Sequence, residues 1–360
     1  MSDSVLRQLL TTRVPTSRLN EFCVDAMLRA GMREEDASVT ADVLVTTDTW
    51  GTFTHGTKQL RPLLKLAVDR VDLVAVPEIV SQGPAWALID GHYALAPVIA
   101  VQAMQLAIEK AKTAGIAYVG VRGSNHFGAC AYYANMAVEH DMIGLAMTNA
   151  NPMVAVPGGC TPILGTNPFS YAVPASEERP IILDIATSIV AASKVLAAKM
   201  LGKSIPDNWV VDDEGQPTTD PSEYPEKGVL LPMAGHKGYG IALMIELLAG
   251  ALTGAQVLDE VKIWITPDSQ PLSQGHCFIA INVDAIMPIA HFKTRVDGII
   301  RNIRNAPRAA GIDRIYLPGE MEWERRDIAM RDGILLPEDV LQRHEGLAQD
   351  YHMDLAALLP

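Results

Sequence analysis

Strand-like and helical patterns alternate through residues 116–147, and this alternation constrains the fold more than any other feature of the sequence. A β-type run at residues 116–121 leads into the glycine-bracketed sequence GSNHFG at residues 123–128. A helical pattern over about 129–140 and an apolar run at 142–147 follow, which predicts a strand–turn–helix–strand unit. No GxGxxG fingerprint follows a strand anywhere in the chain. We therefore expect a mixed α/β protein without an ordinary Rossmann site.

Shorter patterns predict the remaining elements. Helical spacing from Ser17, as N-cap, to Val45 predicts two helices, the second beginning near Glu34 or Glu35. A helix is also expected to begin near Thr187. Further strands are expected at residues 169–173, 181–185 and 277–283, a further helix at 100–112, a surface excursion at 203–228, and a linker with a final helix at 321–354.

The apolar run at residues 238–255 is the one segment that approaches the length of a membrane span. It contains Gly240, Gly250 and Gly254 and is only about 18 residues long. We therefore predict a buried core helix.

Composition excludes several classes of protein. The net charge of −13 leaves no broad basic surface for nucleic acid or anionic lipid. The four cysteines are far apart and form no CxxC pair, so we expect reduced thiols and no metal site. No signal-like apolar stretch is present, and cytoplasmic localisation is the expectation.

Two histidines lie on glycine-bordered turns. His55 stands between Thr54 and Gly56 in DTWGTFTHGTKQL (48–60), and His126 lies in GSNHFG. Histidine exchanges protons near neutral pH, so both are candidates for acid–base catalysis, although a lone loop histidine is often only a packing residue. Backbone N–H groups at the strand-to-helix junction after His126 can also hold an anion.

Two further segments combine polar residues with a helix start. In LDIATS (183–188), Asp184, Thr187 and Ser188 could cap a helix, or Asp184 could orient an imidazole or a ribose hydroxyl. In AGHKGYG (234–240), His236 and Lys237 open an apolar helix. A lysine there favours phosphate binding over a structural role, because the helix dipole disfavours cations at its N-terminus.

Taken together, these motifs resemble the malate/L-lactate dehydrogenase family of the second type, which includes ureidoglycolate, sulfolactate, 2,3-diketogulonate and piperideine-2-carboxylate oxidoreductases. The resemblance covers residues 15 to 345 and rests on THG (54–56), GSNHFGACAYYA (123–134), PGGCTPILGTNPF (157–169), LDIATS, GHKGYG (235–240) and LPGE (317–320). It implies a non-Rossmann α/β fold, with a helical unit from residues 1–80 joined by 300–360 and a cofactor domain at 81–299. A homodimer with its active site near the subunit contact is also implied.

The resemblance further implies a nicotinamide-dependent enzyme that transfers a hydride to or from C2 of a small 2-oxo or 2-hydroxy acid. Its reacting centre would hold His55 and His126, with Thr54 beside them, and either histidine could exchange the proton. The expected dinucleotide site contains Asp184, Ile185, Ala186, Thr187, Ser188, His236, Lys237, Gly319 and Glu320.

One position departs from the family pattern. Members that act on 2-oxo acids usually carry an arginine four residues after the THG or SHG histidine, where it clamps the substrate carboxylate. Here that position is Gln59, flanked by Lys58 and Arg61, which are the alternative substrate-binding cations. The sequence leaves NAD against NADP open, with NAD favoured by overall acidity. It also leaves open a reductase of cyclic 2-imino acids and a non-catalytic binding protein.

Overall fold

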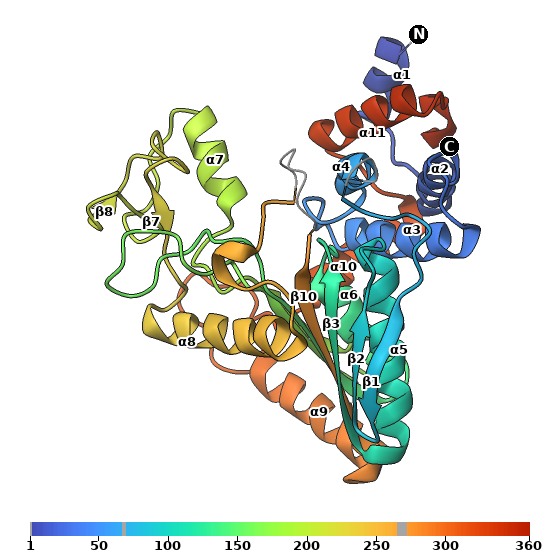
Figure 1. The fold of residues 1–360 in the computed structure, drawn as a ribbon, viewed down its shortest axis with the longest axis vertical. Coiled ribbons are helices and arrows are strands. Elements are labelled where there is room, and N and C mark those ends of the chain that lie inside the picture. The colour runs from blue at the N-terminus through green and yellow to red at the C-terminus, as the bar shows by residue number, and fades with distance from the viewer. Residues whose placement is uncertain (1, 67–69, 265–271) are drawn as a thin grey trace.

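The computed structural model describes residues 2–66, 70–264 and 272–360. Helices from both ends of the chain pack together at one end of the molecule, where both termini lie (Figure 1). An antiparallel bridge between Val14 and Ile334 ties the two ends, and buried residues from both ends, such as Leu19 and Leu347, share one apolar cluster. The elements there are α1 (Ser2–Leu9), α2 (Thr16–Arg29), α3 (Glu34–Thr49), η1 (Thr57–Gln59), α4 (Leu60–Leu66), α10 (Glu320–Asp332), α11 (Glu338–Asp350) and η6 (Leu355–Leu358).

A seven-stranded mixed sheet forms the centre of the molecule, in the order β1-β2-β3-β10-β4-β5-β6. Its β2 and β3 pair in parallel, and each other neighbouring pair is antiparallel. This order differs from the parallel 3-2-1-4-5-6 sheet of a dinucleotide fold. The strands are β1 (Glu78–Gly83), β2 (Trp86–Asp90), β3 (Ile116–Ser124), β4 (Met142–Thr148), β5 (Phe169–Val173), β6 (Ile181–Ile185) and β10 (Gln274–Asn282).

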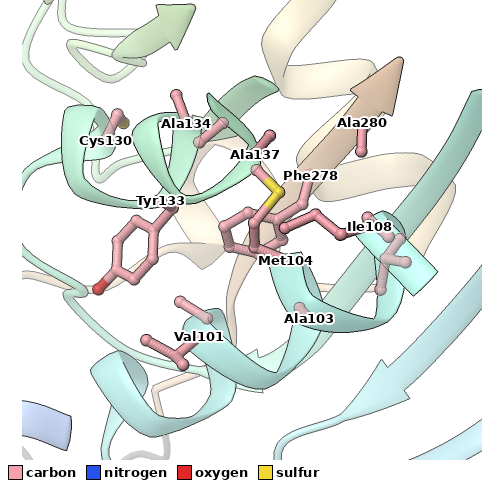
Figure 2. Packing of buried hydrophobic residues seen from close by; sticks show 14 of the residues in the cluster. Val101, Ala103, Met104, Ile108, Cys130, Tyr133, Ala134, Ala137, Phe278 and Ala280 are labelled. Carbon is pink, nitrogen blue, oxygen red and sulfur yellow. The ribbon is translucent and has the colours of Figure 1, made fainter. Parts of the chain in front are cut away.

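Both faces of the sheet are apolar and covered, because alternate residues of a strand point to opposite faces. In β10, Phe278 and Ala280 face helices α5 (Ala96–Ala114) and α6 (Cys130–Val138), as Figure 2 shows. Cys277, the residue before Phe278, packs on the opposite face with Ile245 of α8 (His236–Ile245). The sheet therefore forms the middle layer of three.

A small lobe follows β6. It contains α7 (Ala192–Met200) and a sheet of β7 (Val210–Val211), β8 (Pro217–Thr218) and β9 (Val229–Leu230) in the order β8-β7-β9. Val195, Ile205 and Val210 are buried in its own apolar cluster. The predicted surface excursion at 203–228 is therefore partly a packed unit, because its few apolar residues find partners on α7.

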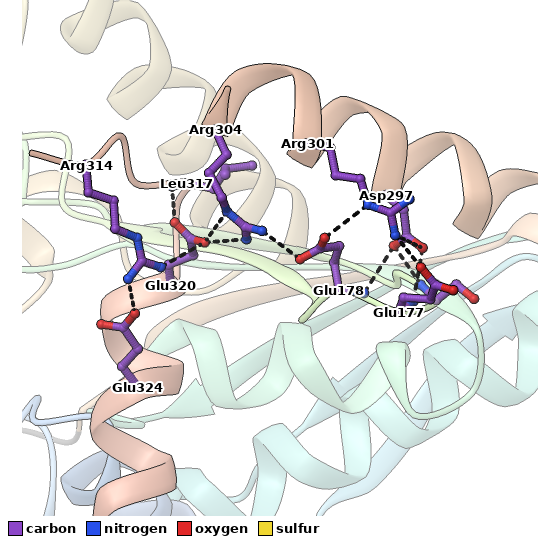
Figure 3. Close-up of polar contacts among 10 residues, drawn as sticks. Glu177, Glu178, Asp297, Arg301, Arg304, Arg314, Leu317, Glu320 and Glu324 are labelled. Atoms are coloured by element: carbon purple, nitrogen blue, oxygen red, sulfur yellow. Dashed lines mark hydrogen bonds and ion pairs between the residues drawn. The ribbon is translucent and has the colours of Figure 1, made fainter. Parts of the chain in front are cut away.

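An alternating chain of charges fastens α9 (Ile289–Arg304) to α10 (Figure 3). Arg304 bonds to Glu178 at 2.9 Å and also to Glu320, which in turn pairs with Arg314 at 3.3 Å. Glu320 additionally accepts a hydrogen bond from the backbone N–H of Leu317. The Glu320 carboxylate therefore accepts four hydrogen bonds from this chain, two of them from Arg304.

Most predicted elements are confirmed, and the strands at 169–173 and 181–185 have the predicted bounds. Two helix starts were wrong. The first helix begins at Thr16 after Pro15, without a side-chain cap from Ser17, and α7 begins at Ala192 rather than near Thr187. Thr187 instead donates its hydroxyl to the backbone oxygen of Thr166, a tertiary bond that sequence patterns do not reveal.

The apolar run predicted as a core helix is only half buried. It begins at His236 as α8, continues as a π turn at Glu246–Gly250 (η2) and ends as a 3-10 turn at Ala251–Thr253 (η3). Leu247 and Leu252 are 54% and 62% exposed, so one face of this segment is uncovered in the single chain. Among the described residues, no helix is long and apolar enough to cross a membrane.

Candidate active site

A cavity of about 810 Å³ lies between the helical unit and the sheet. One wall is the end of α3 and the turn after it, and the opposite wall is the end of β6 with the turn that precedes α10. The start of α6 forms a third wall. Side chains and backbone at Trp50, Thr52, Thr54, His55, Gly128–Ala131, Ile182–Ala186, Tyr316–Gly319 and Glu322 line it, among others.

His55 lies on the cavity wall with Thr54 as its polar partner. The Thr54 hydroxyl is 3.0 Å from His55 Nδ1, and within the described residues no protein group bonds to Nε2. Desolvation by the surrounding protein lowers the pKa of His55. Because Thr54 can accept a hydrogen bond as well as donate one, it can stabilise either protonation state of the ring.

His126 stacks on His55, with ring centroids 5.5 Å apart, although 71 positions separate them in sequence. The Gly128 N–H donates to His126 Nδ1 at 3.2 Å, which leaves the ring proton on Nε2. Burial, followed by the nearby His55 and His276, lowers the pKa of His126 to about 3. The paired histidines thus meet as expected, and His126 is a neutral hydrogen-bond donor near pH 7.

Asp184 caps α6 instead of the helix that follows it in sequence. Its Oδ2 accepts a hydrogen bond from the N–H of Ala131 at 2.8 Å, at a helix start whose N-cap, Ala129, has no side chain able to do so. Its other oxygen has no protein donor among the described residues, and the residue is exposed to the cavity. Desolvation by the cavity walls raises the pKa of Asp184 to about 6, against the Ala131 bond, and Glu322 adds to the rise.

The other residues expected to hold a dinucleotide divide into two groups. Ile185, Ala186 and Gly319 line the cavity beside Asp184. Thr187 and Ser188 are buried behind the cavity wall, where their hydroxyl groups bond to backbone oxygens. Glu320 lies outside the cavity, and its carboxylate forms ion pairs with arginines. The hydroxyls of Thr187 and Ser188 and the carboxylate of Glu320 thus have internal partners in this structure, and the assignment of these residues to the dinucleotide stays a prediction.

His236 and Lys237 are the first two residues of α8. Both side chains are exposed, and within the described part of the chain neither makes a hydrogen bond or an ion pair. They do not line the cavity described above. Their assignment to the dinucleotide stays a prediction.

The residues considered as a carboxylate clamp do not line the cavity. Lys58 pairs with Asp339 and Arg61 with Asp350, both on α11. Gln59 is buried and donates its amide N–H to the backbone oxygen of Thr54 at 2.7 Å. In this structure the two cations hold the C-terminal helix, and Gln59 braces the histidine turn.

Sequence reasoning missed several wall residues. Trp50 and Thr52 lie in the segment that was noted for its histidine. Trp264 was also missed; it does not line the cavity, but it stacks on His126 with ring centroids 4.7 Å apart. Glu322 follows the LPGE motif by two residues and lies between Glu320 and Glu324, so no local signal distinguishes it. Among the described residues, no group of three or more His, Cys, Asp or Glu side chains could hold a metal ion.

Comparison with known proteins identifies the family of the chain. A family model described as malate/L-lactate dehydrogenase matches residues 14–344. The chain belongs to this family. It is therefore an oxidoreductase of the dehydrogenase class, as the motifs had implied.

Three relatives illustrate the range of the family. Malate dehydrogenase from Pyrococcus horikoshii is 36% identical over 345 residues, which cover 94% of this chain and 95% of that protein. The structure of sulfolactate dehydrogenase from Methanocaldococcus jannaschii superposes with a TM-score of 0.88 at 36% identity, covering 96% of this chain and 98% of that one. Delta(1)-pyrroline-2-carboxylate/Delta(1)-piperideine-2-carboxylate reductase from Pseudomonas putida is 31% identical over 92% of this chain and 95% of that protein.

Proposed function

We propose that this member of the family is an NAD-dependent dehydrogenase that interconverts a small 2-oxo acid and its 2-hydroxy acid. The observation that carries the proposal is the stacking of His126 on His55, which lines a cavity large enough for a dinucleotide. When bound, a reduced nicotinamide supplies a hydride to the carbonyl carbon. Negative charge then develops on the carbonyl oxygen and must be neutralised by the protein.

We assign the proton transfer to His55. Protonation of a neutral imidazole places N–H groups on both nitrogens, and Thr54 can accept a bond from Nδ1–H. At His126 the same proton would face the N–H of Gly128, so protonation there is opposed. His55 therefore donates the proton to the carbonyl oxygen, or accepts it in the reverse reaction, while His126 Nε2–H holds that oxygen.

The assignment predicts distinct effects of substitution. His55→Ala should lower kcat on the order of 10²- to 10⁴-fold, the usual contribution of a general acid. His126→Gln, which keeps an N–H donor, should lose less than His126→Ala, and the double variant should lose far less than the product of the single losses. The exposed His140→Ala serves as the control. If both alanine variants kept more than about a third of wild-type kcat, the two-histidine mechanism would be wrong.

The charge of the cavity wall supports NAD over NADP. Asp184 and Glu322 face the cavity, and the described residues that line it include no lysine or arginine. A carboxylate accepts hydrogen bonds from ribose hydroxyls, whereas a 2′-phosphate requires a cation. We expect kcat/KM at least 10-fold higher with NADH than with NADPH, and Asp184→Asn to reduce that ratio. A preference for NADPH would contradict this choice.

The second candidate reaction is reduction of a cyclic 2-imino acid, which the named activity of the Pseudomonas putida relative favours. Absorbance of reduced nicotinamide, followed with a panel of 2-oxo acids, 2-hydroxy acids and cyclic imines, separates the two reactions. Turnover of none of these compounds would contradict both.

We further propose that the enzyme is a cytoplasmic homodimer whose chain divides into a helical unit (1–80 with 300–360) and a cofactor domain (81–299). The exposed apolar side chains of α8 and η2, among them Met244 and Leu247, support a subunit contact. All four cysteines are free, which suits a reducing compartment. Light scattering of the wild type and of Leu247→Glu should give a dimer and a weakened dimer, and a monomeric wild type would contradict this arrangement.

A further inference from the structure

A buried hydrogen-bond chain lies beneath the turn that carries His55. The Thr57 hydroxyl donates to Asp48 Oδ2, and the Thr57 N–H donates to the same oxygen at 3.1 Å. On the other side, His344 Nε2 lies 2.9 Å from the Thr57 hydroxyl oxygen and donates to it. All three residues are at most 1% exposed. The chain joins the end of α3, the start of η1 and the middle of α11.

The chain closes the loop that presents His55. Asp48 and Thr57 stand at the two ends of this loop, and the Asp48 carboxylate lies directly against Gly56. A Cβ on Gly56 would fall 1.8 Å from Asp48 Oδ1, so only glycine permits this approach. Gly56 and Thr57, the two residues that follow His55, are therefore both in contact with the carboxyl group of Asp48.

Two ion pairs also connect α11 to the segment that follows His55. Lys58 bonds to Asp339 and Arg61 bonds to Asp350, so together with His344 three positions along α11 are tied to the segment that follows His55. The C-terminal helix thus reaches the histidine turn through polar contacts as well as through packing.

The chain is costly in stability, which argues against a purely structural role. Asp48 Oδ1 and His344 Nδ1 are buried, and no described residue forms a hydrogen bond with either atom. A buried unsatisfied polar atom costs about 1–3 kcal/mol, and apolar residues of similar volume would avoid that cost. Groups that lower stability in this way are concentrated where a protein needs a fixed geometry for function.

We propose that Asp48, Thr57 and His344 are positioning residues that fix the His55 imidazole for proton transfer, with α11 as their support. This inference rests on the proposed function of His55. None of the three lines the cavity, so they act through the backbone of the His55 turn. Misplacement of a reacting group by about 1 Å can cost on the order of 100-fold in rate.

The test compares one substitution of Thr57 that removes the hydroxyl group with one that keeps it. Thr57→Val removes the donor and acceptor at nearly constant volume, whereas Thr57→Ser retains them. We expect Thr57→Val to lower kcat about 10-fold or more, with the cofactor dissociation constant within about twofold of wild type, and Thr57→Ser to recover most of the rate. Thr40→Val is the matched control, because Thr40 is a buried threonine of α3 whose hydroxyl has no partner.

A second readout is independent of turnover. Selective ¹⁵N labelling of histidine reports the tautomer and titration of the His55 ring, which Thr57→Val and Asp48→Ala should alter and Thr40→Val should not. If Thr57→Val matches Thr57→Ser in kcat and leaves the His55 resonances unchanged, the positioning role is refuted. If the wild type turns over no substrate but the resonances respond, the proposed reaction fails while the coupling between Thr57 and His55 stands.

Discussion

Replacing Asp48 by asparagine should change the pH dependence of stability, with a sign that the buried site determines. Burial raises the pKa of Asp48 to about 7, against the two hydrogen bonds from Thr57. The unfolded chain releases this proton near pH 4, so the folded state binds more protons between about pH 4 and pH 7. The contribution of the carboxyl group to stability is therefore full below pH 4 and is lost as pH rises through 7.

The size of the effect follows from this shift of about 3 pH units. At about 1.4 kcal/mol for each unit, the wild type should lose about 4 kcal/mol relative to Asp48→Asn between about pH 4 and pH 8. Urea unfolding followed by tryptophan fluorescence measures this difference at each pH. Groups that titrate alike in both proteins cancel in the comparison. Parallel curves for the two proteins would refute the argument that Asp48 holds its proton near neutral pH.

Asp297→Asn provides a control of the opposite kind. Burial opposes ionisation of Asp297 too, but the N–H groups of Ser176, Glu177 and Glu178 and the charge of Arg301 outweigh it and lower its pKa. Its stabilising contribution is present above the ordinary carboxyl range and is lost only as pH falls through the lowered pKa. The difference between Asp297→Asn and the wild type should therefore stay constant from about pH 5 to pH 8.

Three further substitutions test other assignments. Lys237→Ala should raise the KM for the cofactor much more than the KM for the substrate, because this exposed cation at a helix start suits a phosphate; equal effects would remove the assignment. Gly319→Ala should lower the thermal midpoint, because φ is +87° and the new Cβ would lie 2.8 Å from the backbone oxygen of Ile182; an unchanged midpoint would contradict the strain. Glu320→Gln should reduce the free energy of unfolding by about 1–3 kcal/mol, because the ion pair with Arg304 is lost, and should leave the KM for the cofactor within about twofold of wild type. A large rise in the KM for the cofactor would instead support a role of Glu320 in cofactor binding.

The sequence predicted five of the seven strands of the central sheet, because their signal is local, and it missed β1 and β2. β5 and β6 are short apolar runs bounded by turn residues, and their limits were read correctly. The start of α7 was missed because Thr187 and Ser188 are typical helix-capping residues. Their hydroxyls instead bond to Thr166 and Val190 around the cavity, and a capping preference of about 1 kcal/mol is easily exceeded by such tertiary bonds.

The meeting of His55 and His126 was also predicted from the sequence, since two histidines on glycine-bordered turns are visible there. The roles of Lys58 and Arg61 were not. Their partners Asp339 and Asp350 lie more than 280 positions away in sequence, and only the return of the C-terminal helix brings the charges together. A cation close to a catalytic residue in sequence is therefore weak evidence for a contact with substrate until its own partners are known.

The same reasoning explains why Asp48 was overlooked although it begins the segment noted for its histidine. In sequence, Asp48 resembles a polar residue at a helix end, where exposure to water is the usual outcome. In the fold it is 1% exposed, and its carboxylate is positioned by contacts with Gly56, Thr57 and, through the threonine, His344. The sequence pattern Thr-His-Gly therefore encodes two requirements at once. Under the proposed function the histidine transfers the proton, and the glycine allows the buried carboxyl group of Asp48 to approach the backbone of the histidine turn.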